Sequence, residues 1–353
     1  RSEQRMREIE VKLRAGMTKK GIVGAAQDRI AKSITSFAMF GFPESHAASF
    51  ALLAYASAYL RTHYLAAFTC ALLNSQPMGF YQPLSLVKDA QRHGLHFKPV
   101  DITRSHWRCT IEEHDDRKCV RLGFNYIKGL GEAVAQAIVS ARAYAPFANI
   151  RDLARRVPSL QKAHMNKLAA AGALNFNLGA EHRRDALWQA DLAVRPVSEL
   201  LEPAAYTPEA SPLAAMDPME RTHADFHNTG LSIGRHPMSY HRDRMNEMGV
   251  ISAEGLHRKP NGRWVSVAGC VICRQRPGTA KGFLFLSLED ETGIANVIVE
   301  PSMFDDNRAA LVETPYVRVD GVLQNQEGVV SVRARRVQAL ETSLARVASH
   351  DFR

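Results

Sequence analysis

The amino-acid sequence predicts a multi-domain protein that is mainly α up to about residue 190 and ends in a small all-β barrel. Three observations lead to this prediction. The 353 residues exceed the usual size of one domain. Apolar residues recur at helical spacing through the first half of the chain. From Trp264 onward, apolar and polar residues alternate in short runs that are separated by turn signals, as in β-strands.

The N-terminal part is predicted to be helical, with one break. Apolar residues at helical spacing predict helices over 1–39, and the two glycines of 21–24 mark the break. A turn follows at 40–46, where Gly and Pro interrupt the pattern and Ser45 is suited to cap the next helix. The apolar run over 47–73 predicts one or two buried helices.

The middle of the chain is divided by changes in this pattern. We predict a helix over 82–93, strand-like alternation over 95–121, and short helices again from 122. Prolines among Ala, Ser and Glu then predict a semi-extended linker, followed by a connector. The resulting domain boundaries are 1–121, 122–190, 191–228 for the linker, 229–262 for the connector, 263–340 for the barrel, and 341–353 for a tail.

The β-rich part has the element order of one known type of barrel. Strands are predicted over 264–273, 282–288, 294–300, 316–323 and 329–337. A short helix at 302–313 separates the third strand from the fourth, and a turn at 325–328 separates the last two. Three strands, a helix and two strands are the layout of an OB-fold. Small β-barrels of other types have the same order, so the pattern alone leaves both open.

Composition and charge restrict the classes of function. The longest apolar run is too short and too polar to cross a bilayer, and the N-terminus lacks the layout of a signal peptide. Five cysteines without a regular framework favour the cytoplasm. The net charge of +9 fits a nucleic-acid partner, although mildly basic proteins without one are common. Because the chain does not begin with Met, we expect it to be part of a longer protein.

The most specific local motif is the Ile-Lys-Gly-Leu-Gly segment at 127–131, which predicts a helix-hairpin-helix element. With a helix on each side, its glycines allow a tight hairpin and leave no side chain in the way. Backbone N–H groups at the start of the second helix can then meet a DNA phosphate, regardless of base sequence. The alternative is a plain helical turn that ends in glycine. We predict DNA contacts at Lys128, Gly129, Leu130 and Gly131.

The barrel also contains candidate contacts to DNA. Leu284, Leu286 and Leu288 share one face of a predicted strand and suit the core, which places Phe283 and Phe285 on the other face. Exposed aromatic rings can stack on single-stranded bases while basic residues contact phosphates. Burial of both faces is the alternative. The expected phosphate partners are Arg274, Arg276, Lys281 and Arg333.

Other candidate sites are weaker. The segment 160–173 is interpreted as a degenerate second hairpin that packs rather than binds. Cys270 and Cys273 lack a second ligand pair at zinc spacing, so no metal site is predicted. The carboxylates of Asp290, Glu291, Asp305 and Asp306 fall on a turn and a helix start, where solvated or capping roles are expected. Two-metal nucleotidyl transfer needs aspartates on a rigid sheet, so we predict no catalytic residue here.

The segment from Phe40 to Pro77 contains a further pattern, made by Gly41, Ser45, His46, Ala47, Tyr55, His63, Phe68, Leu72 and Leu73. With these residues it resembles the fingers segment of bacterial C-family DNA polymerases. Leu65 stands where the family usually has Pro. The continuation over 74–101 is similar to the error-prone subclass rather than to the replicative alpha subunit. The hairpin region and the segment 229–238 follow in the order of the family, so the resemblance covers nearly the whole chain.

The resemblance implies a DNA-directed DNA polymerase of damage-induced mutagenesis and translesion synthesis. Such polymerases have an upstream palm with metal-binding aspartates and Mg²⁺, so we expect this chain alone to be inactive and without a cofactor. The fingers close over template and incoming nucleotide, which makes Ser45, His46 and Tyr55 candidates for a nucleotide-facing edge. Helix capping and packing are the alternative for these three. The hairpin domain then grips the primer–template duplex, and the OB domain lies near single-stranded template.

The resemblance also raises the question of a sliding clamp. Residues Gln189–Leu192 resemble the Gln-x-x-Leu core of a clamp-binding peptide but lack its aromatic end. We therefore expect clamp contact to be indirect, through accessory proteins.

Other classes of protein combine the same modules. A ligase-like repair enzyme needs a Lys-x-Asp-Gly motif or a cysteine zinc module, and the sequence has neither. A fragment of a replicative alpha subunit and a non-catalytic DNA-binding scaffold remain as alternatives.

Overall fold

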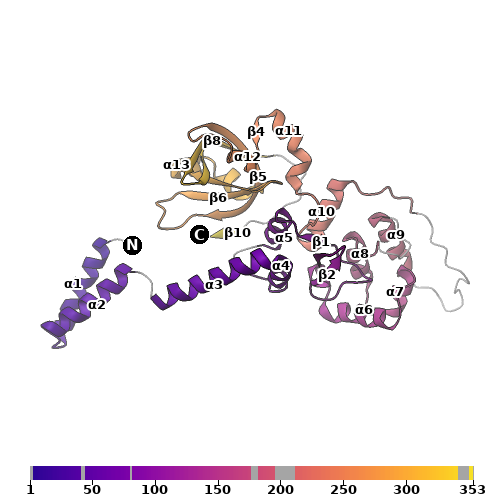
Figure 1. Ribbon diagram of the computed structural model, residues 1–353, viewed down its shortest axis with the longest axis horizontal. Coiled ribbons are helices and arrows are strands. Elements are labelled where there is room, and N and C mark those ends of the chain that lie inside the picture. The colour runs from indigo at the N-terminus through magenta and orange to yellow at the C-terminus, as the bar shows by residue number, and fades with distance from the viewer. Residues whose placement is uncertain are drawn as a thin grey trace, which may run out of the picture. The chain divides into compact units, whose positions relative to one another are not determined.

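The computed structural model describes residues 3–40, 44–79, 82–175, 182–194, 211–340 and 350–352 (Figure 1). The chain divides into two compact units, Arg1–Tyr64 and Leu65–Arg353. Within the described ranges, no helix combines the length and the apolar composition that a membrane crossing requires. Most of the predicted tail and the centre of the predicted linker, 195–210, lie outside the described residues.

The first unit consists of three helices, α1 (Glu3–Lys19), α2 (Ala25–Phe40) and α3 (Glu44–His63). The predicted break falls between α1 and α2, where Gly21 and Gly24 have φ values of 76° and 66°. Such positive φ values are costly for residues with a side chain. Arg14 of α1 donates to the carboxylate of Asp28 in α2 at 2.6 Å and so connects the two helices.

The apolar run over 47–73, predicted to form one or two buried helices, forms two: α4 (Leu65–Asn74) has buried residues in the core, as predicted, whereas the prediction is wrong for α3. Its side chains are exposed along its length, and Tyr55 is 72% exposed. The large apolar side chains that face solvent are Phe50, Leu52, Leu53, Tyr55, Tyr59 and Leu60. Apolar periodicity predicts a helix, but burial also requires a partner surface, and the described residues of the first unit provide none for α3. Gly41, part of the fingers-like pattern, lies outside the described residues.

The second unit begins with two helices and a small sheet. Its elements are α4 (Leu65–Asn74), α5 (Pro83–Arg92), β1 (His96–Lys98), β2 (Thr110–His114) and β3 (Arg117–Arg121). Strand β3 lies in the centre of the sheet, parallel to β1 and antiparallel to β2. Asn74 ends α4 and holds the sheet, because its side chain both donates to the Cys109 carbonyl at 2.9 Å and accepts from the Cys109 N–H at 2.8 Å.

Short helices follow, as predicted for 122–190. They are η1 (Phe124–Tyr126, a 3₁₀ turn), α6 (Glu132–Tyr144), α7 (Ile150–Arg156), α8 (Lys162–Ala170) and α9 (Arg183–Ala193). The buried residues of α6, α7 and α8 join one core with those of α4 and α5. That core includes Leu160, Met165 and Leu168, so the segment interpreted as a second hairpin does pack.

The hairpin differs from the prediction on its N-terminal side. A full helix was expected before it, but only the single turn η1 is present. The N–H groups of Phe124 and Asn125 donate to the carbonyls of His106 and Trp107 at 2.9 and 3.0 Å. Because these two N–H groups bond to the 106–107 segment, they are not available to continue a longer helix. The helical turn before Gly129 is therefore limited to the three residues Phe124–Tyr126.

Helix α10 (Pro218–Thr229) occupies the last part of the predicted linker. Asp217 and Glu220 form a capping box, in which each side chain accepts from the other's backbone N–H. Pro218 is the first residue of the helix, where a missing N–H costs nothing. Gly230, with φ of 79°, ends it.

The C-terminal part is a closed barrel, as predicted. Its strands are β5 (Trp264–Gln275), β6 (Leu284–Glu289), β7 (Ile294–Val299), β8 (Tyr316–Gln326) and β9 (Val329–Ala339). Strand β5 pairs with both β6 and β8, and β9 pairs with β7 and β8, which closes the ring. Two short helices, α13 (Pro301–Asp306) and α14 (Arg308–Glu313), lie between β7 and β8 in the sequence. This is the OB-fold order.

Smaller elements surround the barrel. They are η3 (Pro237–His241), α11 (Arg242–Glu247), β4 (Val250–Ile251), α12 (Ala253–Leu256) and β10 (His350–Phe352). Strands β4 and β10 each run parallel to β5. The barrel core contains Leu284, Leu286 and Leu288, which face inward as the alternation predicted.

Candidate nucleic-acid interface

The hairpin presents unpaired backbone donors at the start of α6. Gly129 has a φ of 77°, and Gly131 precedes the helix in an extended conformation without a capping side chain. The first hydrogen bond of this helix runs from the N–H of Ala135 to the carbonyl of Gly131 at 3.1 Å. Within the described residues, the N–H groups of 131–134 therefore have no acceptor. Such a helix start attracts an anion.

Lys167 of α8 lies beside this turn. A Cβ atom placed on Gly129 would overlap the Lys167 ammonium group. No acceptor lies within hydrogen-bond distance of that ammonium among the described residues. The fold thus brings a cation from 38 positions away in sequence (167 − 129) to the glycine turn. Sequence reasoning missed Lys167, because nothing in the spacing around 127–131 indicates which residue of a later helix packs there.

Lys128 has a structural role that the motif did not predict. Its ammonium group donates to the carbonyls of Phe226 and His227 at 2.8 and 3.0 Å, and its N–H donates to Asn228 at 2.8 Å. These carbonyls belong to the last turn of α10, where a cation is favourable. Lys128 therefore ties the hairpin to α10. Leu130, another predicted contact, is 4% exposed and belongs to the core.

A groove of about 960 Å³ lies over the outer face of β6 and β7 and the adjoining ends of β8 and β9. Phe285 lines it and is 37% exposed, so this ring is available for stacking. Uncharged polar side chains supply much of the rest: Gln275, Ser287, Asn296, Gln324, Gln326 and Ser331. Glu327 is the one charged residue among those that line it. This is the face on which OB-folds bind oligonucleotides.

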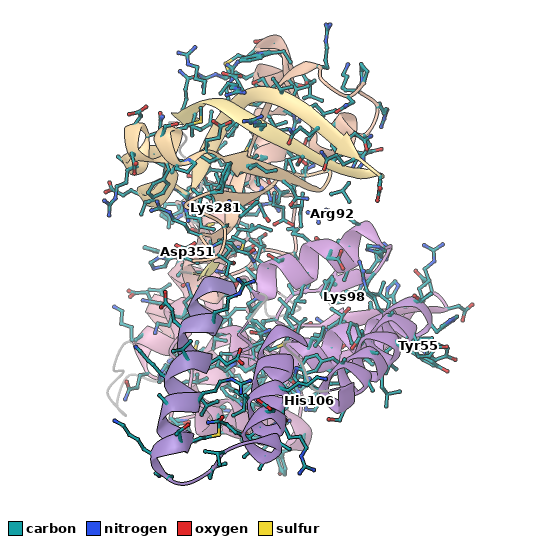
Figure 2. All side chains as sticks on the ribbon, turned by 90° about the vertical axis from the view of Figure 1, so that its left-hand side faces the viewer. Tyr55, Arg92, Lys98, His106, Lys281 and Asp351 are labelled. Carbon is teal, nitrogen blue, oxygen red and sulfur yellow. The ribbon has the colours of Figure 1, made fainter. Side chains whose placement is uncertain are left out.

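The other predicted barrel contacts are not gathered in the groove. Phe283 is half-buried and precedes β6. Arg276 stacks on the Phe304 ring at 4.2 Å from its centroid. Lys281 is exposed in the loop before β6 and is labelled in Figure 2. Arg333 forms an ion pair with Glu300 at 2.5 Å while remaining partly exposed.

Arg274 is buried, at 8% exposure, and serves the barrel itself. Its guanidinium donates to the carbonyls of Leu311 and Thr314 at 2.6 and 2.8 Å and lies 3.4 Å from Asp351. These bonds hold the end of α14 against β5. The Arg274 side chain is therefore occupied within the barrel and poorly placed to contact a phosphate.

The barrel is joined to the helical part of the second unit through a buried charged group, which we call the Glu289 cluster: Lys88, Arg92, His236, Arg242 and Glu289. Glu289 is fully buried and accepts from Arg92 at 2.5 Å (Figure 2 labels Arg92). His236 Nε2 faces the other carboxylate oxygen at 3.8 Å. Lys88 donates to the Gly234 carbonyl at 2.6 Å. Arg242 pairs with Asp290 at 3.0 Å and Glu291 at 2.5 Å.

Burial shifts the titration of this cluster. It lowers the pKa of His236 to about 3, and the neighbouring Lys88, Arg92 and Arg242 add to the effect. It also lowers the pKa of Lys88 to about 8 and raises the pKa of Glu289. His236 Nδ1 accepts from the Met238 N–H at 3.2 Å, so the proton of the neutral ring is on Nε2, facing Glu289. Asp290 on the neighbouring turn is also buried rather than solvated, and its carboxylate has the alternative, capping role, because it accepts from the N–H groups of Thr292 and Gly293 at 2.8 and 3.0 Å.

The three candidates for a nucleotide-facing edge all lie on α3. Ser45 is the second residue of that helix rather than its cap, and His46 and Tyr55 are exposed. His46 and Tyr55 are nine residues apart, about 2.5 helical turns, so their side chains leave opposite sides of α3. His46 instead contacts the Phe50 ring at 4.5 Å between centroids. A single edge cannot contain all three side chains.

The described residues do not fit a Mg²⁺ site. They contain no group of three or more His, Cys, Asp or Glu side chains that could hold a metal ion. The carboxylates of Glu289, Asp290 and Glu291 are paired with arginines instead. No step of a metal-dependent reaction can therefore be derived from them.

Two family profiles match this geometry. A helix-hairpin-helix motif matches residues 94–186, and an OB-fold nucleic acid binding domain matches residues 265–340. Both the hairpin and the groove therefore lie in domains of nucleic-acid-binding type.

Curated relatives match along nearly the whole chain. An error-prone DNA polymerase of Azoarcus sp. (strain BH72) is 45% identical over 100% of this chain and 34% of its own length. Those of Burkholderia mallei and Methylococcus capsulatus are 42% and 41% identical, over 96% and 94% of this chain and 31% and 33% of their own lengths. The chain belongs to the family of the error-prone DNA polymerases. It spans about a third of the length of the relatives that it matches, in their C-terminal part.

The similarity to solved structures is low and covers only a small part of the chain. An asparaginyl-tRNA synthetase from Pyrococcus horikoshii aligns over 28% of this chain and 24% of its own, at 20% identity and a TM-score of 0.22.

Proposed function

We propose that this part of an error-prone DNA polymerase holds the primer–template duplex at the hairpin and single-stranded template in the barrel groove. The observation that carries the proposal is the group of N–H donors at the start of α6 with the Lys167 ammonium beside them. A phosphate is the ligand that satisfies both. The groove supports the second half, because it offers an exposed aromatic ring for stacking and amide side chains for hydrogen bonds to bases.

The activity of the whole polymerase is part of this proposal. We assign damage-induced translesion synthesis to the complete protein, and nucleotidyl transfer with its Mg²⁺ to a part outside these 353 residues. Primer extension by the isolated chain with Mg²⁺ and nucleotides would contradict this assignment. Clamp access through accessory proteins belongs to the same proposal. It is consistent with Gln189, which is 2% exposed within α9 and accordingly poorly placed for a clamp.

The hairpin half is tested by Gly131→Asp. A Cβ at this position meets open space, and its φ of −76° suits any residue. The aspartate would cap α6, so the free energy of unfolding is expected to stay unchanged or rise. The same carboxylate would occupy the N–H groups and repel phosphate. Affinity for a primer–template duplex should therefore fall about tenfold or more, measured by fluorescence anisotropy.

Gly79→Asp is the matched control, since it adds the same charge at another glycine with open space. It should leave duplex affinity nearly unchanged. Equal losses in both variants would mean that only net charge matters, and the hairpin assignment would then be wrong.

The groove half is tested by Phe285→Ala. Loss of one stacking ring is expected to weaken single-stranded DNA binding roughly fivefold to tenfold and to spare duplex binding. Unchanged affinity for single strands would exclude the groove as their site.

A further inference from the structure

An exposed tryptophan lies just outside the groove. Trp264 is the first residue of β5 and is 58% exposed, whereas Val265 and Val267 point into the barrel core. Large aromatic side chains are usually buried, so an exposed indole on a strand indicates a contact surface. Neither the hairpin nor the groove uses it.

The register of the barrel places Trp264 next to the groove. Trp264 pairs with Val322 of β8, and Val322 pairs with Arg333 of β9. Two residues further along these strands, Gln324 pairs with Ser331, and both of these line the groove. Two residues along a strand span about 7 Å, and residues two apart share one face. The outer face is therefore continuous from the groove to the row that holds Trp264.

The surface beside Trp264 is hollowed and positively charged. Trp264, Ser266 and Arg336 line a pocket of about 360 Å³. Arg336 is exposed and has no acidic partner among the described residues. Arg318, also in the lining, is neutralised by Asp320 at 3.1 Å.

The arginines between the groove and the pocket add to this charge. Arg333 and Arg335 share a single carboxylate, that of Glu300, at 2.5 and 3.4 Å. Both lie on β9, with the unpartnered Arg336 next in sequence. This stretch of the outer face therefore carries excess positive charge, in contrast to the groove.

We propose that single-stranded DNA continues from the groove across Arg333 to Trp264, where a base stacks on the indole and Arg336 contacts phosphate. This inference rests on the proposed function of the groove and extends its length. Stacking on Trp together with a nearby cation is the chemistry by which proteins hold single strands without reading sequence. The excess positive charge and the continuity with the groove favour a nucleic acid over a peptide.

The test is the dependence of affinity on DNA length. Oligothymidines of increasing length are titrated against the full chain, and dissociation constants are measured by anisotropy. Short strands that fill only the groove should bind the parent and Trp264→Ala equally. Longer strands should bind Trp264→Ala roughly fivefold to tenfold more weakly, and Trp264→Phe should retain most of the affinity. Arg336→Gln should reduce the salt slope for long strands by about 0.7.

Two controls separate this inference from the proposed function. Tyr144→Ala removes an aromatic side chain that is 92% exposed outside the barrel, and it should change neither length dependence nor affinity. If Phe285→Ala weakens binding but Trp264→Ala matches the parent at every length, the strand ends in the groove and Trp264 serves a protein partner instead. If neither variant weakens binding, the proposed groove function fails as well. Thermal unfolding of each variant must match the parent for these comparisons to hold.

Discussion

The hairpin and the barrel groove offer DNA two different kinds of contact. At the hairpin, the start of α6 presents main-chain N–H groups and Lys167 supplies a charge. In the groove, amides and hydroxyls surround Phe285, and Glu327 is the charged residue of the described lining. The first kind of contact depends on phosphate charge and weakens with salt, whereas stacking depends on it far less. The net charge of the chain therefore says little about the groove.

The largest expected change in the free energy of unfolding comes from disrupting the Glu289 cluster, which connects the barrel to the helical part of the second unit. Glu289→Gln would leave the half-buried Arg92 beside an uncharged group in a buried site, so the free energy of unfolding of the second unit should fall by about 3 kcal/mol. Denaturant unfolding measures it. Glu313→Gln, at an exposed glutamate, should change it by less than about 0.5 kcal/mol. Equal, small changes would show that the Glu289 cluster does not hold the barrel to the helices.

Two lysine substitutions at the hairpin separate a role in stability from a role in DNA binding. Lys128→Met removes charged hydrogen bonds to the end of α10 and should lower the free energy of unfolding by about 1.5–3 kcal/mol. Lys167→Met should leave stability nearly unchanged but reduce the salt slope of duplex binding by about 0.9. Unfolding curves and anisotropy at several salt concentrations separate the two. If Lys167→Met lowered stability and Lys128→Met reduced the salt slope, the roles assigned to these two lysines would be wrong.

The smallest expected change in the free energy of unfolding is the one caused by lowering the pH. The folded pKa of His236 is about 3 and its ordinary value is 6.5, so between these values only the unfolded chain takes up the proton. Stability should therefore fall as pH falls below 6.5, by about 1 kcal/mol between pH 7 and 5.5. The raised pKa of Glu289 acts in the opposite direction at lower pH, since the folded state then binds the proton.

His236→Asn isolates this contribution, because the amide oxygen can still accept from the Met238 N–H. The variant should lose about 1 kcal/mol less than the parent over the same pH range. Parallel pH profiles for the two proteins would show that His236 does not titrate as its burial requires.

Local sequence patterns predicted the helices and strands better than they predicted which distant segments these elements contact. The order of the barrel and the glycine turn of the hairpin follow from alternation and from residues near in sequence. Lys167 and the burial of Arg274 depend on which distant segments pack together, so no spacing rule contains them. The exposure of α3 has the same origin, because an apolar pattern does not say whether a partner surface is present.

Two other differences were within reach of the sequence. The capping box of Asp217 and Glu220 around Pro218 indicates a helix start, but the prolines of this region were interpreted as a linker signal only. Nine-residue spacing likewise separates His46 from Tyr55 on any helix. Resemblance to a family placed the three α3 candidates together, whereas helical geometry separates them.

The contact between α9 and α10 has a consequence for the chain that connects them. Arg183 pairs with Asp225 and Arg184 with Glu220, both at 2.7 Å, so the two helices are held by their own side chains. The ends that the chain between α9 and α10 has to join are therefore held in place independently of that chain. Doubling the length of such a bridge costs about 0.6 kcal/mol. Inserted residues, a tag or an extra module should be accepted there, which makes this stretch the natural place for the polymerase to vary in length.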